Sequence, residues 1–331
     1  MKKTNDFNDK PIVTDVTIRD GGYLNDWNFP VETIRTVVRY LDRFGIDIIE
    51  VGYLSDDESQ PPAARCSAGY LEMLSGDIQS ASIAAMLSPK KHSDPVAVLA
   101  SRKGHVDLVR IPAFVEDMDS VIQVVEEANK LGIRCSMNLV SFTAYTDAEL
   151  LGAVEKIASS GQAEMLYFAD SRGSVHPEEV FTLYSDVREI WKGPLGFHAH
   201  DNLGLAIENS KAALDAGCNL IDCSINGYGL GGRNTEFVQT IDLIRDFRPD
   251  LPEVEKHELK AVVEEIGMPP KEVFHDLYYL TGLKNLEQEW CPILWDTYGD
   301  ACYELLEKLP RGKYKAIEEI LEFADMVGCE R

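Results

Sequence analysis

Residues 31–52 read VETIRTVVRYLDRFGIDIIEVG, and this stretch contains one complete helix-and-strand unit. From Val31 to Phe44 the apolar residues recur every three or four positions, which predicts an amphipathic helix. Gly45 follows at the point where a helix commonly ends in a left-handed residue. The run that begins near Ile46 is almost entirely apolar, as expected of a strand in a parallel sheet with both faces covered. The stretch therefore predicts an α/β fold.

The same unit recurs along most of the chain. Other helices are predicted over Ser120 to Leu131 and Leu203 to Ala216, and a glycine follows each of them. Eight strands are predicted, beginning near Ile12, Ile46, Ile83, Val106, Ile133, Met165, Leu195 and Leu220. Eight such units fit a closed (β/α)8 barrel, the TIM barrel, better than an open doubly wound sheet of about five or six strands.

The strand pattern stops near residue 250. A helix-like pattern follows from Val254 to the end of the sequence, with no further run of strand character. We therefore predict a TIM-barrel catalytic domain over residues 1–250 and a small helical C-terminal extension over residues 251–331.

The chain is strongly acidic. Its 331 residues include 32 Lys and Arg against 56 Asp and Glu, a formal net charge of −24, while 45% of residues are hydrophobic. Such a surface repels phosphate backbones and anionic lipid headgroups, so we expect neither nucleic acid nor a membrane as a partner. The seven cysteines form no C-x-x-C pair, which argues against a cysteine-based zinc site. With no signal-peptide pattern at the N-terminus, we expect a cytoplasmic protein, and a homodimer as its assembly.

Two histidines close the seventh predicted strand, where residues 195–202 read LGFHAHDN. The spacing of two residues puts the imidazoles of His198 and His200 on the same side of a strand, so they could share one metal ion. The alternative is a pair of polar residues that are simply hydrogen-bonded at a strand end. Their position favours the metal, because a barrel carries its chemistry at the C-terminal ends of its strands.

A third ligand is available at the end of the first predicted strand, where residues 17–23 read TIRDGGY. Asp20 would lie on the same rim as the two histidines, with Arg19 beside it. A His-His-Asp set leaves coordination positions open, as a catalytic ion requires. The alternative is an Arg19–Asp20 ion pair that serves only the barrel mouth.

Residues 226–235, NGYGLGGRNT, follow the eighth predicted strand. Gly227, Gly229 and Gly232 satisfy the dinucleotide pattern G-x-G-x-x-G, which is weak by itself. This loop belongs to the last unit, and no following strand offers an acidic residue for a ribose. We therefore favour a loop that brings Asn234 to the metal site.

Together these motifs resemble the DRE-TIM metallolyases, the superfamily of hydroxymethylglutaryl-CoA lyase, and within it the 4-hydroxy-2-oxovalerate aldolases most closely. The resemblance covers about residues 11–248. It rests on Arg19-Asp20-Gly21, residues 49–52 (IEVG), residues 109–117 (VRIPAFVED), residues 169–173 (ADSRG), the two histidines and the glycine loop. The resemblance implies that Asp20, His198 and His200 bind one divalent ion, with Asn234 as a candidate fourth ligand. Mn²⁺ or Mg²⁺ is the expected ion, with Zn²⁺ as an alternative.

The resemblance also implies a reaction. A 2-oxo acid can chelate such an ion, which then acts as a Lewis acid on the keto group. Arg19 would stabilise the enolate that forms when the adjacent carbon–carbon bond breaks. We therefore expect an aldolase that joins or releases a pyruvate enolate and an aldehyde. The alternatives are a Claisen-type synthase that condenses an acyl-CoA with a 2-oxo acid, and a catalytically silent metal-binding sensor or scaffold.

Four features depart from the family or stay open. The aldolases carry an acid/base histidine soon after the aspartate, where this chain has Tyr23, so either Tyr23 takes that role or the reaction differs. Arg233 stands where the family commonly has glycine, and could narrow the pocket or bind a substrate anion. Glu50 is either a proton-handling or supporting group, or an ion-pair partner of Arg19 or Arg110. The helical tail does not resemble the docking region of the channelling aldolases, so we do not expect an aldehyde dehydrogenase partner.

Overall fold

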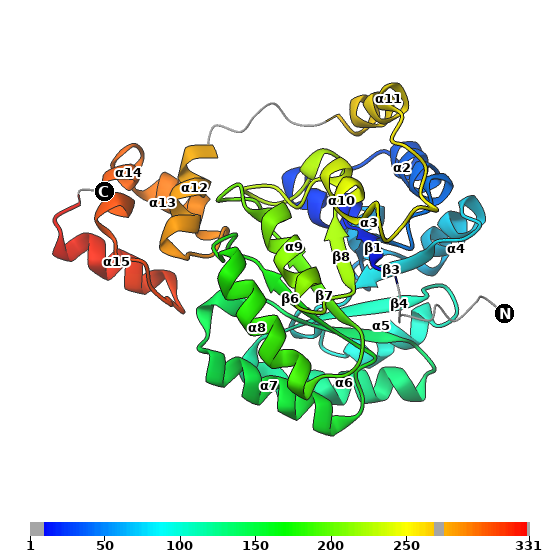
Figure 1. The fold of residues 1–331 in the computed structure, drawn as a ribbon, viewed down its shortest axis with the longest axis horizontal. Helices are drawn as coiled ribbons and strands as arrows, with labels where there is room; N and C mark the ends of the chain where they lie inside the picture. The colour runs from blue at the N-terminus through cyan, green and yellow to red at the C-terminus, as the bar shows by residue number, and fades with distance from the viewer. Residues whose placement is uncertain (1–9, 268–274, 330–331) are drawn as a thin grey trace.

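The computed structural model describes residues 10–267 and 275–329. Its centre is a closed barrel of eight parallel strands in sequence order, and β1 pairs with β8 to close it (Figure 1). The strands are β1 (Ile12–Asp15), β2 (Ile48–Tyr53), β3 (Ser82–Met86), β4 (Leu108–Ala113), β5 (Cys135–Leu139), β6 (Met165–Asp170), β7 (Leu195–Ala199) and β8 (Leu220–Cys223). The predicted TIM barrel is confirmed, and each strand begins within two residues of its predicted start.

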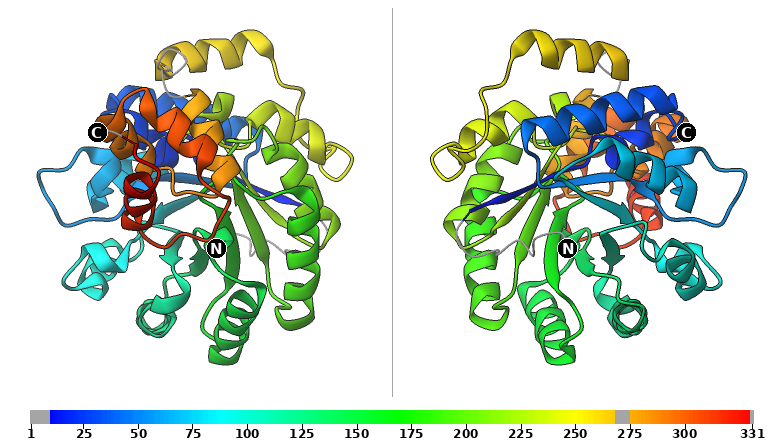
Figure 2. Two further views of the ribbon diagram at one scale, coloured as in Figure 1. Left: turned by 90° about the vertical axis from the view of Figure 1, so that its left-hand side faces the viewer. Right: turned by 90° about the vertical axis from the view of Figure 1, so that its right-hand side faces the viewer.

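Helices surround the barrel, as both views in Figure 2 show. Within the barrel they are α1 (Thr17–Gly21), α2 (Val31–Phe44), α3 (Pro62–Arg65), α4 (Ala68–Asp77), α5 (Pro95–Arg102), α6 (Met118–Lys130), α7 (Asp147–Ser160), α8 (Pro177–Ile190), α9 (Ala206–Asp215) and α10 (Phe237–Ile244). The C-terminal helices are α11 (Lys256–Ile266), α12 (His275–Lys284), α13 (Trp290–Tyr298), α14 (Ala301–Lys308) and α15 (Ile317–Met326). None of the helices in the described ranges is both long and apolar enough to cross a membrane.

One boundary differs from the sequence analysis. The segment that contains Asp20 is a short helix, α1, and the strand before it ends at Asp15. The Asp15 carboxylate accepts hydrogen bonds from the amide and the hydroxyl of Thr17, both at 2.9 Å, and so turns the chain out of the strand. The Asp20 amide then donates to the Val16 carbonyl at 2.8 Å, which closes the helical turn. A side-chain cap of this kind leaves no trace in the hydrophobic pattern.

The barrel interior is built in layers. A lower layer is apolar and consists of Ile12, Ile48, Ala84, Leu108, Met165, Tyr167 and Leu220. Because side chains of a strand alternate between its two faces, the residue two positions after each interior residue also points inward. Two positions after Ile48, Leu108 and Leu220 lie the charged residues Glu50, Arg110 and Asp222, all buried. The interior beyond the apolar cluster therefore contains three buried charged residues, one each on β2, β4 and β8.

Two hydrophobic clusters pack outside the barrel interior. The larger one lies between strands and helices and includes Val262 and Ile266 of α11. The smaller one lies within the C-terminal helices, from Leu277 to Ala324. Helices α12 to α15 form a group at one end of the barrel (Figure 1). The division of the chain at residue 250 stays a prediction.

Candidate metal centre and substrate pocket

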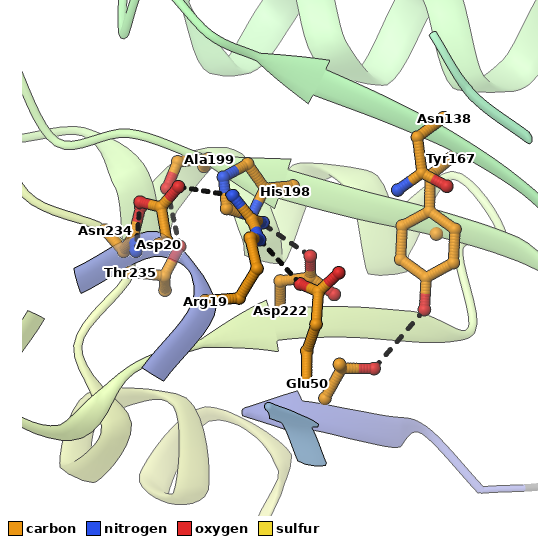
Figure 3. Close-up of polar contacts among 12 residues, drawn as sticks. Arg19, Asp20, Glu50, Asn138, Tyr167, His198, Ala199, Asp222, Asn234 and Thr235 are labelled. Carbon is orange, nitrogen blue, oxygen red and sulfur yellow. Dashed lines mark hydrogen bonds and ion pairs between the residues drawn. The ribbon is translucent and has the colours of Figure 1, made fainter. Parts of the chain in front are cut away.

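Glu50, Arg110 and Asp222 form a buried network of charges next to the predicted metal ligands. Figure 3 shows Glu50 and Asp222 beside Arg19 and His198. The Arg110 guanidinium donates to Glu50 Oε2 at 3.0 Å and to Asp222 Oδ2 at 2.6 Å. Arg19 donates from Nε to the same Glu50 oxygen at 2.8 Å. Burial opposes ionisation of Asp222, but Arg110 and His198 bring its pKa below the ordinary value. Glu50 thus takes the ion-pair position that the sequence left open, and it pairs with both arginines.

The two histidines are oriented by their Nδ1 atoms. His198 Nδ1 lies 3.0 Å from Asp222 Oδ2, and His200 Nδ1 lies 3.2 Å from the Arg233 carbonyl oxygen. Both acceptors require a proton on Nδ1, so Nε2 is the nitrogen of each ring that could bind a metal ion. Burial lowers the pKa of His200 to about 4, which keeps that ring neutral at pH 7. The His200 imidazole is therefore in the form that binds a metal ion.

Asp20 is the third side chain of the predicted metal site. Its Oδ2 accepts hydrogen bonds from Asn234 Nδ2 at 2.8 Å and from the Leu230 amide at 3.2 Å, and Arg19 contacts its Oδ1. Burial alone would raise the pKa of Asp20, but Arg19 and the two histidines hold it well below the ordinary value. Ligand atoms of Asp20, His198 and His200 lie within 4.8 Å of one another, the one such His/Cys/Asp/Glu cluster among the described residues.

The donor set fits a divalent ion. Three buried ligand atoms, two imidazole nitrogens and one carboxylate oxygen, already converge. The buried Asn234 Oδ1 has no hydrogen-bond partner, although burying such an oxygen unpaired is costly. An ion at this point would give that oxygen a partner and leave positions free for a substrate. Asn234 thus fits as a fourth ligand.

The glycine loop makes room for these ligands. A Cβ atom on Gly229 would lie 2.3 Å from Asn234 Nδ2 and 2.6 Å from Asp20 Oδ2. Arg233 has a φ of 76°, the left-handed region that favours glycine, which explains the glycine that the family commonly has there. The Arg233 side chain is exposed and does not line the pocket, so the expectation that it narrows the pocket or binds a substrate anion is wrong.

A pocket of about 440 Å³ is lined in part by the three candidate metal-binding residues. Its lining includes Arg19, Asp20, Tyr23, His198 and His200, which the sequence had singled out, whereas Glu50 and Asn234 lie behind these residues. The lining also includes residues that the sequence analysis missed: Tyr53, Lys91, Asn138, Glu287, Glu289, Trp290 and Lys315. Asp222 was missed too, although a carboxylate inside an apolar strand was a signal that had drawn attention to Glu50.

The C-terminal extension forms one wall of this pocket. Arg172, buried after β6, donates to Glu287 Oε1 at 2.8 Å and to the carbonyls of Asn285 and Tyr314, each at 2.7 Å. Gln288 accepts from the Gly232 amide at 2.9 Å, so the extension also contacts the glycine loop. In the left view of Figure 2 helices α12 to α15 of the extension lie in front of the strands. Its docking is therefore built from buried polar contacts.

Comparison with known proteins places the chain in a family. The family model described as HMGL-like matches residues 10–247. The chain belongs to the HMGL-like family. The resemblance found in the sequence is confirmed, and the buried Asp20, His198 and His200 cluster is consistent with the divalent-metal sites of HMGL-like lyases and aldolases.

Two relatives match similar shares of the chain. A 4-hydroxy-2-oxovalerate aldolase of Geobacillus genomosp. 3 is 32% identical over 228 residues, which are 68% of this chain and 67% of that enzyme. An oxaloacetate decarboxylase of Mycobacterium tuberculosis is 29% identical over 230 residues, 69% of this chain and 68% of that enzyme. The matches thus span about two thirds of each protein.

Solved structures of other proteins share the fold. The N-terminal domain of a candidate aldolase from Bacteroides vulgatus superposes with a TM-score of 0.75 at 26% identity, covering 88% of this chain and 99% of that one. The carboxyl transferase domain of Rhizobium etli pyruvate carboxylase, solved with pyruvate, gives a TM-score of 0.71 at 14% identity, covering 97% of this chain and 61% of that one. The second likeness supports the fold alone.

Proposed function

We propose that this protein is a divalent-metal-dependent aldolase that cleaves a 4-hydroxy-2-oxo acid into pyruvate and an aldehyde. The proposal rests on the buried Asp20, His198 and His200 cluster, with the guanidinium of Arg19 beside it, at the floor of the pocket. The aldolase relatives, at about 30% identity, support the same reaction class.

The chain's own residues have separate tasks in this proposal. Asp20, His198, His200 and Asn234 would hold the ion. When bound, it polarises the keto group of the substrate and stabilises the negative charge of the enolate. Arg19 is held by Glu50 and Asp20, so its guanidinium is already in place where the enolate oxygen develops charge. Because these groups are buried before the substrate arrives, little reorganisation is needed during the reaction.

Tyr23 lines the same pocket and is the candidate proton donor. Burial raises its pKa, so at neutral pH the phenol carries its proton. In the direction of carbon–carbon bond formation it would orient and protonate the aldehyde oxygen. In the cleavage direction the same atom would take the proton of the 4-hydroxyl group after losing its own proton to solvent.

A second candidate, decarboxylation of oxaloacetate, is favoured by one observation. The chain has a phenol at Tyr23, where the aldolases have a more basic imidazole. Loss of carbon dioxide forms the same pyruvate enolate but removes no proton from a hydroxyl group. The oxaloacetate decarboxylase relative supports this alternative.

The test compares the two substrates directly. The purified protein with Mn²⁺ is mixed with a 4-hydroxy-2-oxo acid or with oxaloacetate, and pyruvate is followed by coupling to lactate dehydrogenase. Free Mn²⁺ without protein corrects for spontaneous decarboxylation. We expect cleavage of the hydroxy acid, and its loss in His198→Ala, which removes one metal ligand. Release of pyruvate from oxaloacetate alone would replace the aldolase proposal by the decarboxylase.

The same preparation separates the remaining alternatives. A Claisen-type synthase would release free thiol from acetyl-CoA in the presence of a 2-oxo acid, which a thiol reagent detects. A silent metal-binding protein would bind Mn²⁺ in a titration and turn over none of these compounds.

A further inference from the structure

Tyr23 does not stand alone in the pocket. Its hydroxyl lies 2.8 Å from the hydroxyl of Tyr53, and both side chains line the pocket. The two rings meet edge to face, with centroids 6.4 Å apart. The Trp27 ring packs edge to face against both, at 4.7 Å from Tyr23 and 5.4 Å from Tyr53. Three aromatic side chains therefore fix the distance between the two hydroxyl groups.

The backbone is shaped to bring them together. The pairing of β2 with β3 shifts register between Glu50 and Tyr53, so a bulge redirects the end of β2. Gly52 lies in this bulge with a φ of 138°, and a Cβ atom there would lie 1.8 Å from the Ala63 carbonyl oxygen. On the other side, Trp27 Nε1 donates to the Arg19 carbonyl at 2.8 Å, which ties the aromatic group to the arginine of the site.

We propose that Tyr53 is a positioning residue that donates its hydroxyl hydrogen bond to Tyr23, so that the Tyr23 proton points to the substrate. This inference rests on the proposed aldolase function. Two hydroxyls joined by one hydrogen bond leave one proton free, and that proton belongs to the acceptor. Tyr23 is the better acceptor for this purpose because it follows Arg19 and Asp20 on the same short segment.

The proton balance then closes with the pair and solvent water. As the new carbon–carbon bond forms, the electron pair of the aldehyde C=O moves to oxygen, and this oxygen takes the proton of Tyr23. Tyr23 becomes a phenolate that keeps the hydrogen bond from Tyr53, which is stronger to a charged acceptor than to a neutral one. Cleavage is the reverse: Tyr23 first loses its proton to solvent, the phenolate removes the 4-hydroxyl proton as the bond breaks, and solvent returns a proton to the enolate carbon to give pyruvate. Burial raises the pKa of Tyr23, while the hydrogen bond from Tyr53 and the charge of Arg19 act in the opposite direction.

A double-mutant cycle tests the inference. We expect Tyr23→Phe to lower kcat for aldol cleavage about 100-fold, in the range for loss of a general acid/base group. Tyr53→Phe should lower kcat about tenfold with little change in KM. The substitution removes the hydrogen bond that stabilises the Tyr23 phenolate, but it removes no contact that binds the substrate. The double variant should be no slower than Tyr23→Phe, because Tyr53 acts only through Tyr23. Metal affinity, measured by calorimetry, should stay the same in all three.

Tyr70→Phe is the matched control. Tyr70 donates its hydroxyl to the Val51 carbonyl at 3.1 Å, so it also contacts β2, but it lies outside the pocket. Its variant should lose stability without losing kcat, and the melting temperature of each variant separates the two effects.

The outcomes distinguish the inference from the function on which it rests. Exchange of pyruvate methyl protons with deuterated water, followed by NMR, should persist in Tyr53→Phe, since it needs the enolate but no aldehyde. If the unaltered protein cleaves the hydroxy acid and Tyr53→Phe keeps its full rate, the positioning role is wrong. A larger loss in Tyr53→Phe than in Tyr23→Phe would reverse the two roles and also overturn it. If the unaltered protein neither cleaves nor exchanges, the proposed function itself fails.

Discussion

Asp222 connects the charge network to His198 of the candidate metal site, as Arg19 connects it to Asp20, and Asp222→Asn tests the first connection. A single oxygen of this buried carboxylate accepts from both His198 Nδ1 and Arg110 Nη2, at 3.0 Å and 2.6 Å. The substitution keeps the shape of the side chain and removes its charge. We expect the variant to fold, and to bind a divalent ion more weakly because His198 is a poorer ligand.

The magnitude follows from the hydrogen bond to His198. A hydrogen bond to a charged group contributes about 1.5–3 kcal/mol, and a neutral one about 0.5–1.5 kcal/mol. The difference, about 1–1.5 kcal/mol, corresponds to about a tenfold loss of metal affinity. This agrees with the roughly 10- to 100-fold loss of metal affinity when the hydrogen-bond partner of a metal-binding histidine is substituted in other proteins.

Calorimetric titration with Mn²⁺ at pH 7 measures the effect, and Asp47→Asn is the matched control. One oxygen of Asp47 also accepts from two donors, the Val13 amide at 2.9 Å and Arg248 Nη1 at 2.7 Å, but at the opposite end of the barrel. Both variants should lose stability in urea, and only Asp222→Asn should lose metal affinity. An Asp222→Asn affinity within twofold of the unaltered protein would refute the reasoning.

Three further predictions concern other parts of the site. Arg19→Lys should keep its metal affinity in calorimetry but lower kcat about 100-fold, because one ammonium cannot replace the planar guanidinium at the enolate; an unchanged kcat would remove Arg19 from this role. Gly229→Ala should lose metal affinity because its Cβ atom would displace Asn234 and Asp20, whereas Gly152→Ala, in open space on α7, should bind Mn²⁺ normally. Burial raises the pKa of Asp170 from 3.8 to about 6, so between pH 4 and pH 6 the folded state retains a proton that the unfolded state has released. The free energy of unfolding should therefore fall by about 3 kcal/mol as pH rises through this window, relative to the Asp170→Asn variant. Urea titrations at each pH measure it for both proteins. Plots of this free energy against pH that run parallel for the two proteins would contradict the prediction.

Much of the fold could be predicted because its signal is periodic. Apolar strands and amphipathic helices repeat along the barrel, and glycines such as Gly45 end the helices in the left-handed conformation. The end of β1 could not be placed in this way. It depends on hydrogen bonds from Thr17 to the Asp15 side chain, which follow no period.

The residues of the candidate site also fall into those that a regular sequence pattern predicts and those that depend on irregular contacts. His198 and His200 could be paired because their spacing on a strand fixes their direction, and Asp20 because all strands end on one rim. Glu287 and Lys315 could not be found, since a helical pattern does not tell where a helix docks. Their place in the pocket depends on the buried Arg172, whose bonds to the extension join residues that are far apart in the sequence.

The extension has its own hydrophobic cluster, from Leu277 to Ala324, and yet supplies one wall of the pocket. If the proposed aldolase function holds, the ion and enolate chemistry is encoded in the barrel strands and loops, while part of the surface that would meet the aldehyde is encoded in a separately packed stretch of chain. In that case we expect a substitution at Trp290 or Lys315, which line the pocket, to change which aldehydes are accepted without straining the barrel. Such a division lets natural selection, or a protein engineer, retune substrate range while the bond-breaking machinery stays constant.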